Sequence, residues 1–169
     1  LYRMLQLPMI TPSSFYIEYI LPAAGNDTFP VEQTRLIARD ILKNCTAYQE
    51  ELPIFVEKVQ QLKFVFNSNN EANCPCDLYD PHVPLLQSIL PSYCFPHSDH
   101  SSDTTSLQSL RMLGLKRELT AEGVVFAIEC INNEYQALST NTLANKDSMV
   151  RTLVERATHL ISFIDKRFD

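Results

Sequence analysis

The stretch DLYDPHVPLLQSILP, residues 77–91, predicts a turn, a helix start and a run of core residues in direct succession. Asp80 is expected to cap a helix whose first residue is Pro81, because a carboxylate accepts from free backbone N–H groups and proline has none to satisfy. Pro91 is expected to end this helix. The apolar residues predicted to face the core are Val83, Leu85, Leu86, Ile89 and Leu90. The helix is therefore predicted to lie centrally in the fold.

The composition is that of a globular protein. Of the 169 residues, 45% are hydrophobic and 20% are charged, which is ordinary for a chain that builds a core. The apolar runs are too short to span a bilayer. A net charge of −6 also argues against binding to a phosphate backbone. The composition therefore predicts neither a membrane span nor a nucleic-acid partner.

The cysteine count bears on the compartment. Five is an odd number, and Cys45 and Cys130 fall in helical patterns, where a free thiol behaves as a small hydrophobe. The opening LYRMLQLPMITP has no apolar core or cleavage site typical of a secretory signal. Two glycosylation sequons, at Asn26 and Asn44, are interpreted as chance matches. A reducing, cytoplasmic location is predicted.

Helical patterns occupy the chain before residue 63. Three helices are predicted: a short, largely buried one over residues 11–21, one over residues 30–44 and one over residues 53–61. Thr46 and Gln49 have the spacing of a capping box ahead of the third.

A change of period at residue 63 predicts a small β-hairpin. Lys63–Phe66 is aromatic and β-branched, as strands are, and Asn67–Asn70 is a turn-forming run. A second strand is predicted around Cys76–Leu78. Residues 92–105, rich in Ser, Asp, His and Pro, are predicted to form a solvated loop.

The third quarter of the chain contains clear helix signals. Asp103 is expected to cap a helix that ends at Leu113, with Gly114 in the left-handed conformation and Leu115 as a packing contact after it. Thr120 is expected to cap the next helix.

Two long helices are predicted at the end of the chain. The first carries one apolar stripe, formed by Val124, Ile128, Ile131, Tyr135 and Leu138. The second runs over residues 146–168, with these side chains predicted inward: Met149, Val150, Leu153, Val154, Ala157, Leu160, Ile161 and Ile164. The fold class predicted is mainly α (α+β), a single helical domain over residues 1–169 with a small β-hairpin and a C-terminal antiparallel helical hairpin. A division into subdomains at residues 1–115 and 116–169 is the alternative.

Few residues suggest chemistry. The three glycines are isolated, so no phosphate-binding loop and no cofactor are expected, and no nucleophile motif is present. The one pointed cluster pairs Cys-x-Cys with Cys-x-x-His-x-x-His, a spacing that supplies zinc ligands. Its members are Cys74, Cys76, Cys94, His97 and His100. Loop cysteines and histidines without a metal are the default interpretation, and the chain is predicted not to be an enzyme.

The order of elements and several motifs carry a resemblance to a known family. The motifs are SFYIEYILP, LYDPHVPLLQSILPSYCFP and SLQSLRMLGLKRELTAEGVVFAIECI. Together they resemble the large internal repeat of the sacsin family, in the part that follows its GHKL-type ATPase module. One departure is the hairpin turn, where FNSNNEANCPC replaces the glycine turn of the family. The matching positions include Tyr79, Asp80, Pro81, Val83, Pro84, Leu85, Leu113, Gly114, Leu115 and Thr120.

The resemblance implies a non-catalytic role. It implies a scaffolding segment of a giant cytoplasmic protein linked to chaperones and proteostasis, which contacts neighbouring modules, clients or partners, while ATP binding belongs to other modules. Two alternatives stay open: a metal-dependent enzyme built on the Cys/His cluster, and a helical adaptor unrelated to chaperones.

Overall fold

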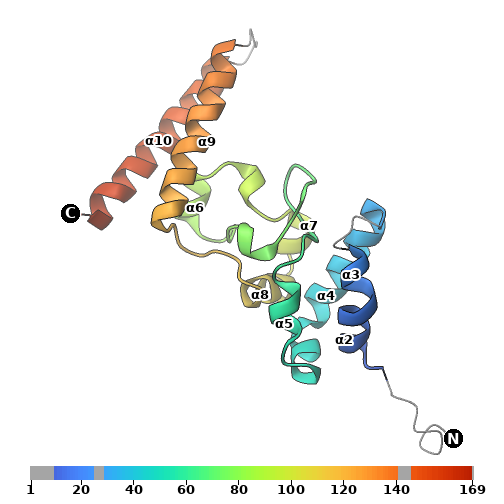
Figure 1. Ribbon diagram of the computed structural model, residues 1–169. Coiled ribbons are helices and arrows are strands. Elements are labelled where there is room, and N and C mark those ends of the chain that lie inside the picture. Colours follow the sequence, from blue (N-terminus) through green and yellow to red (C-terminus); the bar gives the residue numbers. More distant parts are fainter. Residues whose placement is uncertain (1–9, 25–28, 141–145, 169) are drawn as a thin grey trace, which may run out of the picture.

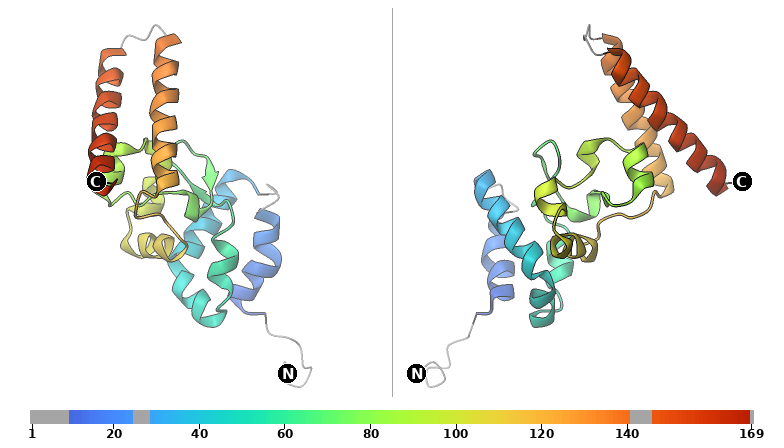
Figure 2. Two further views of the ribbon diagram at one scale, coloured as in Figure 1. Left: turned by 60° about the vertical axis from the view of Figure 1, so that its left-hand side comes forward. Right: turned by 180° about the vertical axis from the view of Figure 1, so that it is seen from behind.

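The computed structural model describes residues 10–24, 29–140 and 146–168, and it is mainly helical, as predicted (Figure 1). The described part of the chain before residue 120 forms a helical body that carries one small β-hairpin, and two long C-terminal helices project away from that body (Figures 1 and 2). The elements are α2 (Pro12–Phe15), η1 (Tyr16–Ile20, a π-helix), α3 (Leu21–Ala24), α4 (Val31–Glu51), α5 (Phe55–Val59), β1 (Val65–Phe66), β2 (Ala72–Asn73), η2 (Pro75–Asp77, a 3₁₀ turn), α6 (Pro84–Ile89), η3 (Ser92–Cys94, a 3₁₀ turn), α7 (Ser98–Ser101), α8 (Thr104–Met112), α9 (Ala121–Thr140) and α10 (Lys146–Phe168).

The first helices depart from the predicted boundaries. Residues 12–24 are helical throughout, so the first predicted helix does not end before Pro22. Phe15 and Tyr19 are exposed, although this helix was predicted to be largely buried. Helix α4 continues through the Thr46–Gln49 pattern, which therefore caps nothing. It ends at Glu51, with Leu52 as its C-cap, and Pro53 divides it from α5 as expected. The prediction of a separate helix start at Thr46 was wrong because no residue there breaks the helix.

The β-hairpin is confirmed, but its second strand lies earlier in the chain than predicted. Val65 pairs with Asn73 and Phe66 pairs with Ala72, in antiparallel register. The predicted second strand at Cys76–Leu78 is instead largely a 3₁₀ turn. The turn needs no glycine because Asn70 adopts a φ of 63°, which asparagine tolerates.

The side chain of Asn67 substitutes for missing backbone partners in this turn. Its Oδ1 accepts from the backbone N–H groups of Asn69 and Glu71, at 2.9 and 3.0 Å. A buried asparagine side chain therefore holds the turn between β1 and β2 in place.

The central helix begins three residues later than predicted. Pro84, not Pro81, occupies its first turn, and Asp80 does not cap it, because the Asp80 carboxylate accepts from His82 N at 2.8 Å in a turn ahead of the helix. Leu86 and Ile89 are fully buried, whereas Leu85 is 41% exposed. The prediction that Leu85 belongs to the core was therefore wrong.

The segment predicted as a solvated loop, residues 92–105, is packed against the body. It contains η3 and α7, and Cys94, Phe95 and His100 are buried. Backbone bonds attach it on two sides, from Tyr79 N to Cys94 O at 2.9 Å and from His97 N to Phe66 O at 2.8 Å. These distant contacts order a polar sequence that has little structure of its own.

Helix α8 has the start and end that were predicted. Asp103 accepts from Ser106 N at 2.9 Å, and Gly114 has a φ of 97°. Leu115 N then bonds to Leu110 O at 3.0 Å, which completes a Schellman-type end with Leu115 buried. A side chain at position 114 would also meet Cys76 Cβ at 3.3 Å. The sharp turn here therefore requires glycine.

Helices α9 and α10 form the predicted antiparallel hairpin, with Thr120 Oγ1 accepting from Gly123 N at 3.2 Å at its start. Figure 2 shows the two helices side by side. Of the predicted inward side chains, Leu138, Leu153 and Leu160 are buried. Others are exposed, contrary to prediction: Ile128, Tyr135, Met149, Val154 and Ile161.

Two clusters of buried residues form the core. One joins α3, α4, α5, β1 and α8, and the other joins the 79–95 segment to α9 and α10. Leu78 belongs to the first cluster and Tyr79 to the second, because successive side chains of an extended segment point to opposite sides. The division into subdomains at residue 115 stays a prediction. Residues 79–95 pack against α9 and α10.

The revised position of the central helix gives a paired test. Leu86→Ala is expected to lower the free energy of unfolding by about 2–5 kcal/mol, because it leaves a cavity in the core. Leu85→Ala, its exposed neighbour, is expected to cost less than about 1 kcal/mol. Denaturant unfolding of both variants measures the two values, and a larger cost for Leu85→Ala would show that the helix is rotated from the orientation described.

Candidate functional site

The Cys-x-Cys pair lies beside the end of α5. Cys74 Sγ is 3.3 Å from Gln61 O, and Cys76 Sγ is 3.5 Å from Gln60 O. Each thiol thus contacts a backbone carbonyl, and burial raises the pKa of Cys74. The pair is half-buried and anchors η2 to the preceding helix.

Cys94 lies in a different place, in the second core cluster. It is buried with Cys130 of α9, and burial raises the pKa of Cys94 to about 12. All five cysteines are free thiols. Cys94 therefore acts as a small core residue under α9.

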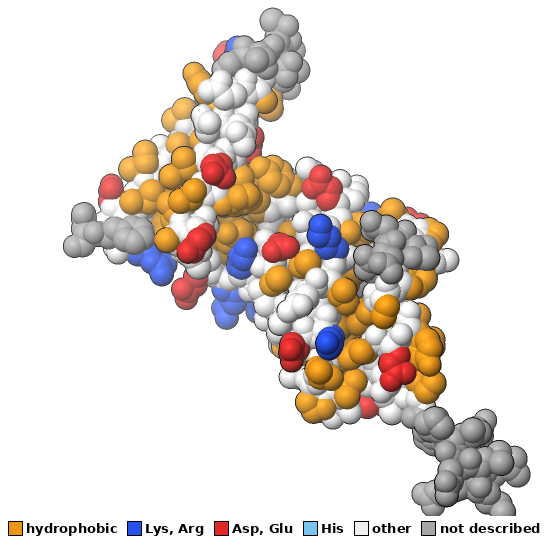
Figure 3. All heavy atoms as spheres, viewed as in Figure 1, with side chains coloured by type: hydrophobic (Ala, Val, Ile, Leu, Met, Phe, Trp, Pro, Cys, Tyr) orange, Lys and Arg blue, Asp and Glu red, His pale blue; other side chains and the backbone are white. Residues whose placement is uncertain are grey.

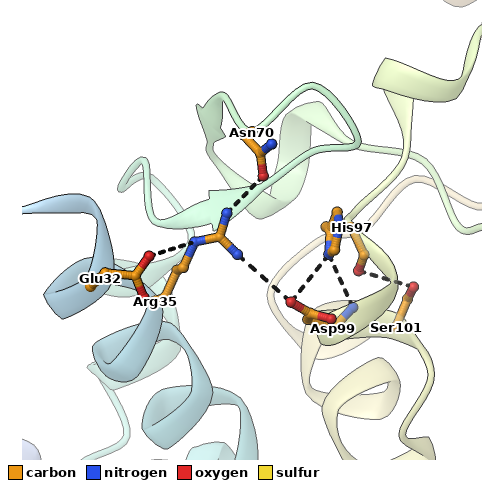
Figure 4. A network of polar contacts seen from close by, with 6 residues as sticks. All are labelled: Glu32, Arg35, Asn70, His97, Asp99 and Ser101. Carbon is orange, nitrogen blue, oxygen red and sulfur yellow. Dashed lines mark hydrogen bonds and ion pairs between the residues drawn. The ribbon is translucent and has the colours of Figure 1, made fainter.

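The two histidines of the motif take separate roles around α7, and Figure 4 shows the first of them, His97, beside Asp99. His97 caps α7 by accepting from Asp99 N at Nδ1, at 3.3 Å. His100 is buried and stacks on Phe66, with ring centroids 6.4 Å apart, and burial lowers its pKa to about 4. His100 is therefore a neutral core residue near pH 7.

Arg35 of α4 ties this corner together, as Figure 4 shows. Its Nη2 donates to Asn70 Oδ1 at 2.7 Å, and its Nη1 lies 3.7 Å from Asp99 Oδ2. The guanidinium also lies 4.9 Å from the centroid of the Phe66 ring. One arginine thus joins α4, the hairpin turn and α7.

The five residues considered as an alternative metal site do not converge. Among the described residues, no group of three or more His, Cys, Asp or Glu side chains is arranged to hold a metal ion. Cys74 and Cys76 contact the end of α5, and Cys94 lies beside Cys130. His97 accepts from Asp99 N, and His100 stacks on Phe66.

This arrangement predicts two classes of thiol. Cys74 and Cys76 are expected to react with a disulfide reagent in the native protein, because both are half-buried. Cys45, Cys94 and Cys130 are buried, and burial also raises the pKa of Cys45 to about 11, so these three are expected to react only on unfolding. Counting released thiolate with and without denaturant measures both classes. Five fast thiols would contradict the packing described.

The Tyr79–Asp80 motif forms the junction between the two core clusters. The Asp80 side chain is completely buried, and its Oδ2 accepts from Arg111 Nε of α8 at 2.7 Å. Arg117 Nε lies farther from the same oxygen, at 3.7 Å. The backbone of Asp80 also donates to Lys116 O, at 2.8 Å. One carboxylate thus connects the turn before α6 to the end of α8 and the chain beyond it.

The surroundings of Asp80 favour its charged form. Burial raises the pKa of Asp80, but hydrogen bonds from Arg111 and from the backbone of His82 outweigh that effect and hold the pKa below its usual range. A buried carboxylate with several donors stabilises the fold only while it stays ionised.

Asp80→Asn is expected to lower the free energy of unfolding by about 2–4 kcal/mol at pH 7, because Arg111 loses its buried ionic partner. The pKa of Asp80 is lower in the folded state than in the unfolded state, where it is about 4. The contribution of Asp80 to the free energy of unfolding is therefore complete above the unfolded pKa and is lost as the pH falls through the folded pKa. The difference between wild type and Asp80→Asn should therefore shrink as the pH is lowered from 7 toward 3. Urea unfolding across this range measures it.

The two arginines provide the control. Arg111→Gln should cost about 1.5–3 kcal/mol, and Arg117→Gln less than about 0.5 kcal/mol, since Arg117 is exposed and more distant. Equal costs would show that the short contact with Arg111 is not the important one.

A further candidate is an apolar groove of about 490 Å³ between α9 and α10. Val154 and Ile161 on α10 are each 59% exposed, and Ile128 on α9 is 50% exposed. Asn132 adds an amide to an otherwise mostly aliphatic lining. Figure 3 shows hydrophobic side chains gathered over the hairpin. The aliphatic side chains that line the groove include Ile128, Ile131, Val150, Val154, Ala157 and Ile161.

A buried arginine that was not predicted makes the hairpin rigid beneath this groove. Arg156 of α10 donates from Nη1 to Glu134 Oε2 of α9 at 2.7 Å, and from Nε to Ile89 O of α6 at 2.9 Å. The available signal was its place between Leu153 and Leu160, on the buried side of the helix.

Comparisons with protein-family models, with curated proteins and with solved structures found no match. The resemblance to sacsin repeats therefore stays a prediction based on the motifs quoted above. Within the described parts of the chain, no helix combines the length and the hydropathy needed to cross a bilayer.

Proposed function

We propose that this chain is a non-catalytic scaffolding domain that binds protein through the groove between α9 and α10. The observation that carries the proposal is the exposure of Ile128 on α9 and of Val154 and Ile161 on α10, which line one groove on a projecting hairpin. Grooves of this kind accept the apolar face of an amphipathic helix. Large exposed aliphatic side chains gathered in one groove are characteristic of protein-binding surfaces.

The rigid connection of the hairpin to the body supports this role. Arg156 joins α9, α10 and α6, and Asp80 joins the turn ahead of α6 to α8. A groove on a pre-ordered hairpin costs less conformational entropy on binding than one that must first be formed. The body therefore serves to present the hairpin.

The sequence resemblance supplies the wider setting of the proposal. A sacsin-like segment would belong to a giant chaperone-linked protein in the cytoplasm, and would contact neighbouring modules, clients or chaperone machinery. The metal-dependent enzyme is the weaker alternative, because the Cys and His side chains it needs have separate partners. The plain helical adaptor would use the same groove.

Site-specific crosslinking tests the groove. A photoreactive phenylalanine analogue placed at Val154 is expected to crosslink protein when the chain is expressed in cells. The matched control places the same analogue at Leu36, an apolar residue that is 62% exposed on α4 and far from the hairpin in sequence. Mass analysis of the products distinguishes copies of this chain from other proteins. If position 154 crosslinks nothing while the protein is folded, the groove is not a binding surface.

A further inference from the structure

We infer that the partner in this groove is a second copy of the same chain, packed so that the two hairpins form an antiparallel four-helix bundle. The inference rests on the proposed function, because it names the occupant of the proposed groove. Three features of the exposed face are each complementary to the same face of a second copy that runs in the opposite direction. They are its apolar residues, its polar centre and its charges.

The apolar residues of α10 are arranged symmetrically. Val154, Thr158 and Ile161 follow one another at spacings of 4 and 3, so they share a face of the helix. If two copies of α10 cross in opposite directions at Thr158, Val154 of each lies against Ile161 of the other. A twofold axis makes every contact twice, as in isologous dimers.

The exposed face of α9 has its centre at the same height. Because α9 and α10 run antiparallel and Arg156 pairs with Glu134, Thr158 is about level with Asn132. Ile128 and Tyr135 lie four residues before and three residues after Asn132. The same twofold axis therefore also brings Ile128 of one copy against Tyr135 of the other.

The centre of this face is polar on α9, and on α10 Thr158 lies at the same level beside the groove. Asn132 lines the groove, and Thr158 directs its hydroxyl to Val154 O at 2.8 Å. An asparagine at the axis meets its own copy, and a single amide pair inside an apolar interface selects one register of packed helices. The polar centre thus favours the alignment that the apolar residues require.

The charges on the outer edge of α10 complement each other in the same alignment. Arg151 lies seven residues before Thr158, and Asp165 lies seven residues after it. Both are exposed, and in the crossed pair each Arg151 meets the Asp165 of the other copy. A parallel arrangement would place like charges together. Charge complementarity therefore selects a copy of this chain in antiparallel orientation.

Sedimentation equilibrium of the purified chain tests the inference. The chain is expected to reach twice its 19.3 kDa mass at concentrations up to about 100 µM. Val154→Asp is expected to weaken the dimer at least about 100-fold, because the axis buries two added carboxylates. Leu36→Asp, at an equally exposed apolar position on α4, is the control and should leave the dimer unchanged.

A charge exchange tests the orientation without touching the apolar face. Arg151→Asp and Asp165→Arg alone are each expected to weaken self-association about tenfold, since each opposes like charges twice. Mixed one to one, the two variants should associate with each other about as tightly as wild type, because every contact is again between opposite charges. Both substitutions are on the exposed side of α10, so folding should be unaffected.

The possible outcomes separate this inference from the proposed function. A chain that stays monomeric throughout overturns the self-pairing, and so does a dimer that is insensitive to Val154→Asp or a mixture that does not recover. A monomeric chain whose position 154 crosslinks a protein of different mass retains the proposed function with another occupant. A folded chain that crosslinks nothing and does not associate contradicts both.

Discussion

The buried carboxylate of Asp80 is the interaction on which the rest of the structure depends. It receives hydrogen bonds from Arg111, at the end of α8, and from the backbone of His82, while its own N–H bonds to Lys116 O. These contacts close a loop of about thirty residues, because they bring the chain at Asp80 against the chain at residues 111–116. Leu78 and Tyr79, immediately before it, face different core clusters. The polar bonds at this junction thus act together with the Arg156 contacts and the second core cluster to fix the position of the α9–α10 hairpin on the body.

Gly114 makes this junction possible. Its left-handed conformation ends α8 so that Arg111 is still on the helix while Lys116 already runs beside Tyr79. The close approach of Cys76 leaves little room for a side chain there. Tyr79 is covered in turn by the Lys116 ammonium, 5.2 Å from its ring centroid. The LGLK sequence therefore works together with LYDP, although about thirty residues separate them along the chain.

The sequence was most informative where the signals are local. The caps at Asp103 and Thr120 and the glycine stop at Gly114 are found as predicted, because each depends on residues within one turn. Helices α9 and α10 are also found as predicted, because each carries a long periodic pattern. The Asp80 segment does lie at the junction of the two core clusters, but its carboxylate pairs with Arg111 and does not cap the central helix as predicted. Arg111 is distant in sequence, and no local rule distinguishes a carboxylate that caps a helix from one that pairs with a distant arginine.

The exposed groove could not be predicted for a related reason. A helical period shows how wide an apolar stripe is, but not which neighbour covers it. On α10 the stripe runs from Leu160, which is buried, round to Ile161 and Val154, which are exposed. Helices α9 and α6 cover only part of that width, and the Arg156 contacts prevent the helix from turning its other side inward. The hairpin of α9 and α10 therefore exposes a wider apolar face than its own fold covers, and both the proposed scaffolding role and the proposed self-pairing depend on that uncovered width.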